Sequence, residues 1–215
     1  MTLKKALIVL AAVAMASGAN AATIMYDFGT PSGDLGHSHT YTDIPSGLSI
    51  IATGYDNLGH LTDLWGKNGT GDENGLGMAN DPTGDHEIHY GMGFVQLDVS
   101  KLFGKVKAAS TDFGTNSTTS GEEWGIYGSN IAGSFSGSPL IIGTIETTHL
   151  LPDFGLYKYY DFKEMTNPSG QGDNFLIHDL TTARVPEPAT WAMLLVGFAA
   201  LGAALRARRA AAAAC

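Results

Sequence analysis

The feature that most constrains this chain is an apolar run from Ala189 to Leu205 that ends at Arg206, Arg208 and Arg209. The run has no polar face beyond its first turn, which favours a membrane helix over an amphipathic helix packed on a domain. Its 17 residues would reach about 25 Å, slightly less than a hydrocarbon core of about 30 Å. We therefore predict a marginal transmembrane helix over 189–205. The three arginines would be its membrane stop, and 206–215 would be a basic cytoplasmic tail.

The other end of the chain is typical of a secretory signal peptide. Lys4 and Lys5 precede an apolar stretch over 6–16, and Ala19 and Ala21 supply the small-x-small pattern that signal peptidase accepts. We predict a signal peptide over 1–21, with cleavage after Ala21. The Sec machinery and signal peptidase would then be partners of the chain.

Before the apolar run stand Pro186, Glu187 and Pro188, followed by Trp191 and Ala192. This segment, with the arginines that end it, resembles a PEP-CTERM protein-sorting tail. The resemblance implies that an exosortase, a membrane cysteine protease, recognises the Pro-Glu-Pro element and removes the helix. It also implies that the chain comes from a bacterium that makes exopolysaccharide. Some ice-binding proteins are grouped with this tail by name, but the regular threonine ladders of an ice face are absent from this sequence.

The two prolines have a physical role in such a tail, because each fixes φ and pushes the residue before it toward extended geometry. We predict that 184–188 is a short, stiff stem which a processing enzyme can grip. Cys215, the single cysteine, lies in the predicted cytoplasmic tail. The exported part therefore has no disulfide, thiol nucleophile or cysteine-ligated metal.

Between the two ends lies one predicted domain, 22–183, which is long enough for a real core. It contains six lysines and no arginine against 20 acidic residues, a formal charge of −14. No basic sequence patch is available to neutralise phosphates, so nucleic acid is not an expected partner. Such acidity suits solubility, cation binding or contact with neutral sugars.

Short apolar segments alternate with glycine-rich turns throughout this domain, a pattern that predicts an all-β fold. We expect a two-sheet antiparallel, jelly-roll-like β-sandwich, with a closed barrel as the alternative. The expected strands cover 23–28, 48–55, 63–65, 93–98, 105–113, 123–129, 140–147, 156–162 and 174–182. The segments 71–77 and 121–130 are similar to stretches of other exported domains with PEP-CTERM tails, which the resemblance implies to be jelly rolls without a known catalytic role.

The most polar segment, 67–87, is a candidate calcium loop. Its side-chain oxygen donors are Asp72, Glu73, Asn74, Asp81, Asp85 and Glu87. Calcium takes six to eight oxygen ligands, and glycines let a loop wrap around it. The spacing is not that of an EF-hand, and the same residues are also normal turn formers. Calcium is therefore an open alternative to a domain without a cofactor.

Aromatic side chains are the second candidate site, because flat rings stack on sugar faces. The candidates are Trp65, Trp124, Tyr127, Tyr157 and Tyr159, with Tyr160 as a further member. A tryptophan on a strand is more often part of the core. These rings are candidates for sugar contact, and the resemblance of the tail implies exopolysaccharide as a possible partner of the domain.

Enzymatic functions have less support in the sequence. His37 with His39, and His86 with His89, could be metal-ligand pairs, but no third ligand is indicated. Glu122 or Glu123 with a second acid could act in glycoside hydrolysis. We expect an exported structural or binding protein of the cell surface or matrix and no catalytic residue. A calcium-stabilised adhesin and a carbohydrate-active hydrolase remain the alternatives.

Overall fold

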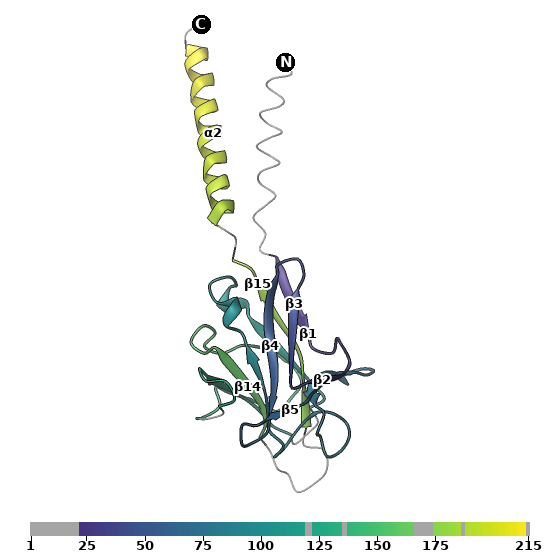
Figure 1. Cartoon of the computed structure of the whole chain (residues 1–215). Coiled ribbons are helices and arrows are strands. Elements are labelled where there is room, and N and C mark those ends of the chain that lie inside the picture. The colour runs from purple at the N-terminus through teal and green to yellow at the C-terminus, as the bar shows by residue number, and fades with distance from the viewer. Residues whose placement is uncertain (1–21, 119–121, 135–136, 166–173, 186–187, 214–215) are drawn as a thin grey trace. The chain divides into compact units, whose positions relative to one another are not determined.

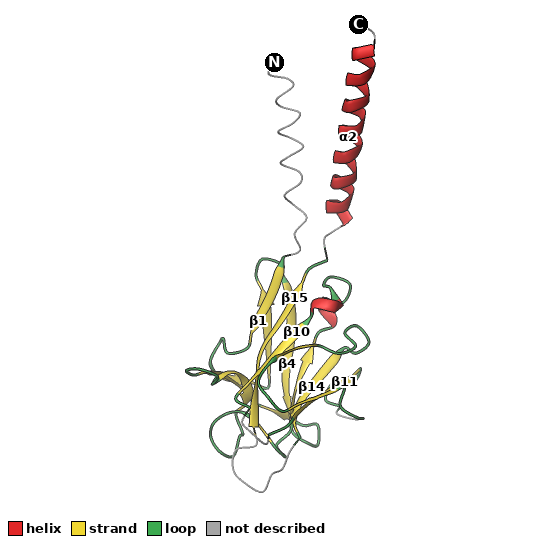
Figure 2. Cartoon of the chain, turned by 180° about the vertical axis from the view of Figure 1, so that it is seen from behind, coloured by secondary structure: helices red, strands yellow, loops and turns green. Residues whose placement is uncertain are grey.

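The computed structural model describes residues 22–118, 122–134, 137–165, 174–185 and 188–213. The chain divides into a compact unit, Thr23–Ala183, and a second unit made of the residues on either side of it. The compact unit is a β-sandwich, whose strands are drawn in Figure 1 and, from behind, in Figure 2. The predicted signal peptide, with Ala19 and Ala21, lies outside the described residues.

The first sheet of the sandwich is organised around the last strand, β15 (Asn174–Ala183). Its strand order is β13 (Thr148–Leu150), β10 (Asp112–Asn116), β15, β7 (Asn74–Met78), β6 (Leu64–Asn68) and β2 (Gly33–Gly36). β1 (Thr23–Asp27) and β8 (Ile88–His89) also pair with β15. β15 is long enough to pair with β1 over its second half and with β7 and β8 over its first half.

The second sheet has the order β12 (Ile141–Gly143), β11 (Trp124–Ser129), β14 (Tyr159–Glu164), β9 (Phe94–Asp98), β4 (Leu48–Tyr55) and β3 (Ser38–Asp43). The short β5 (Leu61–Thr62) pairs with β4. All the strand pairings in both sheets are antiparallel. The predicted all-β fold with two antiparallel sheets is confirmed.

The core lies between the two sheets and is rich in aromatic rings. Trp124 and Phe162 from the second sheet meet Phe113 and Phe175 from the first, and all four are fully buried. The Phe113 ring lies edge-on to Trp124 and to Phe162, with centroids 5.6 and 5.4 Å away. Edge-to-face pairs of this kind add to the free energy of burying the rings. These contacts join the two sheets.

The predicted strands agree best with the structure where apolar and polar residues alternate. β1, β4, β9, β11 and β15 lie within a residue or two of their predicted bounds. The prediction over 105–113 was wrong: the chain makes short 3-10 turns, η2 (Ser100–Leu102) and η3 (Ala108–Ser110), before β10 begins at Asp112. The stretch 140–147 also differs, because β12 ends at Gly143 and β13 begins at Thr148.

The predicted strands omit β2, β3 and also β7, which lies inside the segment 67–87 expected to be one loop. Two glycines let this strand lie where it does. A Cβ on Gly77 would stand 2.0 Å from the carbonyl oxygen of His86, and one on Gly75 would stand 2.5 Å from that of Ile177. Glycine is strand-poor by propensity but permits such close backbone approaches. The segment is therefore a β6–β7 hairpin followed by a loop over 79–87.

The second unit contains one long described helix, α2 (Pro188–Ala213). The helix predicted at 189–205 therefore forms, and it continues past the arginines. Within the described residues, however, no helix is long and apolar enough to cross a membrane. The prediction of a transmembrane span at 189–205 is corrected accordingly. Three arginines close the apolar run after 17 residues, which is shorter than the roughly 20 that a span requires.

Candidate functional site

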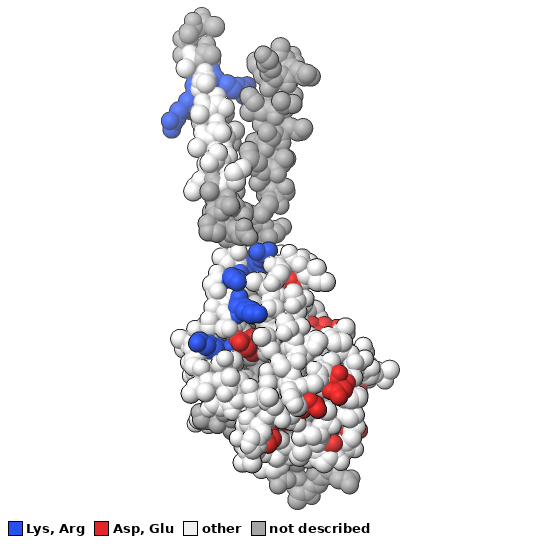
Figure 3. Space-filling model, in the orientation of Figure 1, with Lys and Arg blue, Asp and Glu red and all other residues white. Residues whose placement is uncertain are grey.

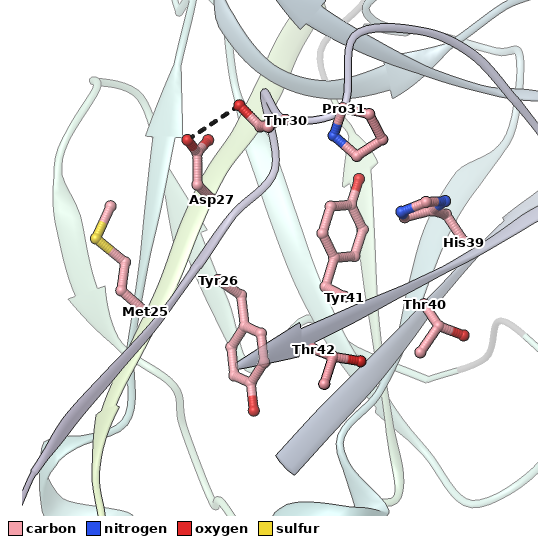
Figure 4. Close-up of a pocket in the computed structure, with 9 residues that line it drawn as sticks. All are labelled: Met25, Tyr26, Asp27, Thr30, Pro31, His39, Thr40, Tyr41 and Thr42. Carbon is pink, nitrogen blue, oxygen red and sulfur yellow. Dashed lines mark hydrogen bonds between the residues drawn. The ribbon is translucent and has the colours of Figure 1, made fainter. Parts of the chain in front are cut away.

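A groove lies where the edge strands of the two sheets face each other. β1 pairs only with β15 and β3 pairs only with β4 among the described strands. The groove has a volume of about 310 Å³. Figure 4 shows its lining residues, which are Met25, Tyr26, Asp27, Thr30, Pro31, His39, Thr40, Tyr41 and Thr42. We call it the β1–β3 groove.

Strand alternation divides the residues of the groove into two kinds. Tyr26 and Tyr41 point inward and are 2% and 5% exposed. Asp27, Thr40 and Thr42 point outward and are exposed. The outward side chains are hydrogen-bonding groups, whereas the inward tyrosines form an aromatic floor. Such a surface suits a polar, uncharged ligand with several hydroxyl groups.

The aspartate and its turn shape one end of the groove. Asp27 accepts hydrogen bonds from the amide of Gly29 at 2.9 Å and from Oγ1 of Thr30 at 3.3 Å, the second of which is dashed in Figure 4. Tyr41 donates from its hydroxyl to the carbonyl of Phe28 at 3.5 Å. The Asp27 carboxylate is thereby oriented at the rim, where it can accept hydrogen bonds from a ligand.

Burial keeps both tyrosines of the floor neutral. Burial, reinforced by Asp43, raises the pKa of Tyr26 to about 12. Burial, reinforced by Asp27, also raises the pKa of Tyr41. The His39 ring lies 4.7 Å from the Tyr41 ring at an interplanar angle of 71°. The groove therefore offers neutral donors and acceptors beside one carboxylate.

The structure does not bring the predicted aromatic residues together as a sugar platform. Trp124 is fully buried and Tyr127 is 6% exposed, so these two predictions were wrong. Both lie on β11, and neighbouring elements cover both faces of that strand. Trp65 is half-buried and stacks on His86 with ring centroids 4.0 Å apart. Tyr157 and Tyr159 are half-buried, while Tyr160 is fully buried in the core.

Two of the predicted calcium ligands are instead joined by a lysine. Lys67 donates to Glu87 Oε1 at 2.5 Å and also pairs with Glu73. Oγ of Ser117 donates to Glu87 at 2.8 Å and to Glu73 at 3.1 Å. We call these four residues the Lys67 cluster. Lys67 and Ser117 were not among the predicted site residues, because their distance in sequence from Glu87 hides the contact.

Burial dominates the chemistry of this cluster. Glu87 is 2% exposed. Its burial raises its pKa to about 7, although the hydrogen bonds from Lys67 and Ser117 and the lysine charge act in the opposite direction. The pKa of Glu73 is lowered by its contact with Lys67, which outweighs its own partial burial. Ser117 has a left-handed backbone with φ of 60°, a conformation that is uncommon outside glycine.

The side chains of the other predicted calcium ligands share no hydrogen-bonding partner in the described part of the chain. Asp81 stabilises its own turn, because its carboxylate accepts the amides of Thr83 and Glu87, each at 3.0 Å. Asp72 and Asp85 are exposed, and Asn74 is half-buried. Among the described residues, no group of three histidine, cysteine or acidic side chains could hold a metal ion. A calcium site would therefore need backbone and water oxygens in addition to these side chains.

The predicted histidine pairs do not converge on a common centre. His37 Nδ1 lies 2.7 Å from Asp63 Oδ1, whereas His39 lines the β1–β3 groove. His86 stacks on Trp65, and His89 Nδ1 lies 2.9 Å from the carbonyl of Tyr90.

The candidate acids Glu122 and Glu123 differ in burial. Glu122 is 3% exposed and accepts the amide of Asn174 at 3.4 Å, while Glu123 is half-buried. The backbone amide of Glu123 donates to the buried carboxylate of Glu164 at 3.2 Å. Both buried acids therefore accept backbone amides where β11 and β14 meet the loops beside them.

The remaining candidate site is the sorting segment. The amide of Arg184 donates to the carbonyl of Ala22 at 3.0 Å, and Val185 is 41% exposed. Pro186 and Glu187 lie outside the described residues, Pro188 begins α2, and Trp191 and Ala192 lie in its first turns. Arg206, Arg208 and Arg209 are exposed on the same helix. Met193, Leu195, Val196 and Phe198 are between 57% and 68% exposed.

Comparison with known proteins assigns this segment. Residues 184–209 match the family model described as PEP-CTERM protein-sorting motif. Comparisons with curated proteins and with solved structures find no match. The match covers Arg184, the Pro-Glu-Pro residues and all three arginines of α2. The chain therefore carries a PEP-CTERM protein-sorting motif over residues 184–209.

Proposed function

We propose that this chain is an exported protein which an exosortase processes at the inner membrane, and whose β-sandwich then binds a neutral exopolysaccharide at the cell surface. The PEP-CTERM motif implies export and sorting by an exosortase, and it is the observation that carries the proposal. The binding role and the identity of the polysaccharide go beyond the motif. They rest on the β1–β3 groove and on the charge of the domain.

The order of the sorting segment suits processing at a membrane surface. Pro186 and Pro188 each disfavour helical geometry in the residue that precedes them, which suits a segment that an enzyme must grip directly before α2 begins at Pro188. The exposed apolar side chains of α2 would enter the lipid, and its arginines would remain at the headgroups. Such contact would hold the chain transiently at the inner membrane while the exosortase acts. Sec-dependent export and cleavage after Ala21 would precede this step.

The sandwich supplies the features expected of a neutral-sugar binding module. Exposed Asp27, Thr40 and Thr42 can exchange hydrogen bonds with sugar hydroxyls in the β1–β3 groove. The domain carries a formal charge of −14, which repels acidic polymers outside local lysine-rich surfaces. A neutral polysaccharide avoids this repulsion. We propose binding and not catalysis, because the groove offers a single carboxylate and its tyrosines are held neutral.

The sorting step can be tested by the mass of the mature protein. Replacing Pro186, Glu187 and Pro188 by alanine should leave the full C-terminal segment attached in cells that contain an exosortase. The matched control is Val185→Ala, an exposed neighbour of the element. It should be processed as the wild type is. Normal processing of the triple variant would show that another signal directs sorting.

A further inference from the structure

The lysines of the sandwich are unevenly distributed. Four of the six, Lys101, Lys105, Lys107 and Lys158, are exposed and belong to neighbouring segments. The amide of Lys107 donates to the carbonyl of Ala183 at 2.8 Å, and the amide of Val99 donates to the carbonyl of Lys158 at 3.0 Å. We call the surface formed by these four lysines the basic end. It lies where β15 ends and the chain continues into the sorting segment.

An exposed apolar turn borders the basic end. Nζ of Lys101 donates to Oγ of Ser49 at 3.4 Å, and Ser49 is the second residue of β4, just after the turn that joins β3 to β4. Ile44 is at the tip of that hairpin and is 89% exposed, more than any other large apolar side chain of the described sandwich. Leu156, two residues before Lys158, is 67% exposed. The basic end therefore combines lysines with protruding apolar side chains.

The rest of the sandwich has the opposite charge. On the face drawn in Figure 3, the blue side chains of the sandwich all lie in its upper half, whereas red ones lie beside them and over the lower half, where no blue is seen. The two remaining lysines are engaged by neighbours, Lys67 with Glu73 and Glu87, and Lys163 with Asn57 at 2.6 Å. Three acids lie near the basic end: Asp43 and Asp98 accept the amides of Ser46 and Ser100, and the exposed Asp153 is in the turn of Leu156, whose amide donates to its carbonyl at 3.0 Å. The domain thus has a charge asymmetry along its strands.

From this arrangement we infer that the basic end is a docking surface for anionic phospholipid headgroups. Lysines around an apolar tip are typical of proteins that rest on a membrane, because the tip enters the headgroup layer while the charges attract acidic lipids. The acidic remainder of the sandwich is repelled by the same surface, which gives one orientation. The inference rests on the proposed sorting at a membrane, since the sorting segment follows directly on Ala183. Docking would hold the stem before the exosortase.

Vesicle binding by the full chain tests the inference. The measured quantity is the ratio of binding to vesicles of phosphatidylcholine with phosphatidylglycerol over binding to phosphatidylcholine alone. Any purely apolar contribution of α2 is common to both vesicles and cancels. Replacing Lys101, Lys105, Lys107 and Lys158 by glutamine should lower the ratio about tenfold or more, since each lysine near an anionic surface contributes several-fold. The wild-type ratio should fall as salt is added.

Three further variants separate the basic end from the general charge of the domain and from α2. Ile44→Ser should weaken binding to anionic vesicles while leaving the fold intact, because Ile44 is outside the core. Asp72→Asn with Asp85→Asn changes the net charge at exposed positions of the 67–87 segment and should leave the ratio within twofold. Replacing the arginines of α2 by glutamine should lower the ratio independently of the lysines.

The results that would overturn the inference are distinct from failure of sorting. An unchanged ratio in the four-lysine variant, with a wild-type circular dichroism spectrum, would reject the docking surface. The docking surface would also be rejected if the binding ratio of the Asp72→Asn, Asp85→Asn variant differed from the wild-type ratio by as large a factor as that of the four-lysine variant. If the four-lysine variant lost binding to soluble alginate but bound vesicles as the wild type does, the surface would be assigned to an acidic polysaccharide and the docking surface for lipid would be rejected. Normal exosortase processing with no vesicle preference would leave the proposed function standing and reject docking alone.

Discussion

The carboxyl group of Asp161 lies buried against Gln96 across β14 and β9. Nε2 of Gln96 donates to Oδ1 of Asp161 at 2.7 Å, and Oε1 of Gln96 accepts the amide of Gly133 at 3.0 Å. Oδ2 of Asp161 is buried with no hydrogen-bond partner among the described residues. Both residues lie on the outer face of the second sheet, yet Asp161 is fully buried and Gln96 is 1% exposed. The loop after β11 is thereby fixed over that face.

The stability of the sandwich should decrease as the pH rises toward neutrality. Burial raises the pKa of Asp161 from its ordinary 3.8 to about 7. The folded state therefore keeps a proton that the unfolded state loses between about pH 4 and pH 7, so the free energy of unfolding falls across that window. The contribution of protonated Asp161 to the free energy of unfolding is complete below its pKa in the unfolded state. It is lost as the pH rises through its pKa in the folded state. Glu87, whose pKa is raised to about 7, acts in the same direction.

Asp161→Asn should reduce this pH dependence and raise the free energy of unfolding at pH 7 by about 1–3 kcal/mol. Asparagine keeps an acceptor for Gln96 and carries no charge. Urea titrations at several pH values measure the slope. Asp72→Asn, the same change at an exposed site, should leave it as in the wild type. A wild-type slope in Asp161→Asn would show that this carboxyl group is not buried as the structure places it.

Loss of the lysine from the Lys67 cluster should be more harmful than loss of the whole ion pair. Lys67→Met leaves Glu87, whose side chain is 3% exposed, without its cation. We expect a loss of about 2–4 kcal/mol in the free energy of unfolding at about pH 9, because the buried Glu87 must then stay charged without its cation or take up a proton against the high pH. Lys67→Met with Glu87→Gln should recover part of that loss. Urea unfolding of both variants measures the difference, and Lys107→Met is the exposed control. Additive losses in the double variant would contradict a coupled pair.

The β1–β3 groove should account for polysaccharide binding by the sandwich. Thr40→Val with Thr42→Val removes two exposed hydroxyls at nearly constant volume. Each lost hydrogen bond should weaken binding by about 0.5–1.5 kcal/mol. The measurement is calorimetric titration with the neutral exopolysaccharide of the producing strain. Thr148→Val, an exposed threonine on β13, should bind as the wild type does. Equal affinities for all three proteins would place the ligand elsewhere.

Substitutions in the acidic 67–87 segment should show whether it contains a structural turn or a calcium site. Asp81→Ala removes the acceptor for the amides of Thr83 and Glu87. It should lower the free energy of unfolding by about 1–2 kcal/mol, and with it the melting temperature, whether or not calcium is present. Asp72 is the cleaner probe of calcium, because its side chain is exposed and outside that turn. A rise in melting temperature on adding calcium that disappears in Asp72→Ala would establish the adhesin alternative. Identical melting curves with calcium and with a chelator would exclude it.

The aromatic predictions show what a strand pattern conveys and what it leaves out. Trp124 and Tyr127 lie on opposite faces of β11, as alternation requires. A solvent-exposed outer face would have left Tyr127 available to a sugar. In the structure the loop at Gly133 is hydrogen-bonded to Gln96 over that face, and Tyr127, the cross-strand neighbour of Asp161, is only 6% exposed. Covering by a distant loop has no local sequence signal.

The sequence alone determined the C-terminal sorting segment and the class of the domain. Address signals are read as short, continuous peptides, so Pro186 to Arg209 can be recognised without any fold. Alternating apolar residues likewise predict strands, because the side-chain period of a strand is local. Tertiary structure alone decided which distant residues meet: Lys67 with Glu87, Asp161 with Gln96, β1 with β3 across a groove, and four lysines at one end. Those contacts depend on how two sheets pair and pack, and strand order is a property of the whole chain.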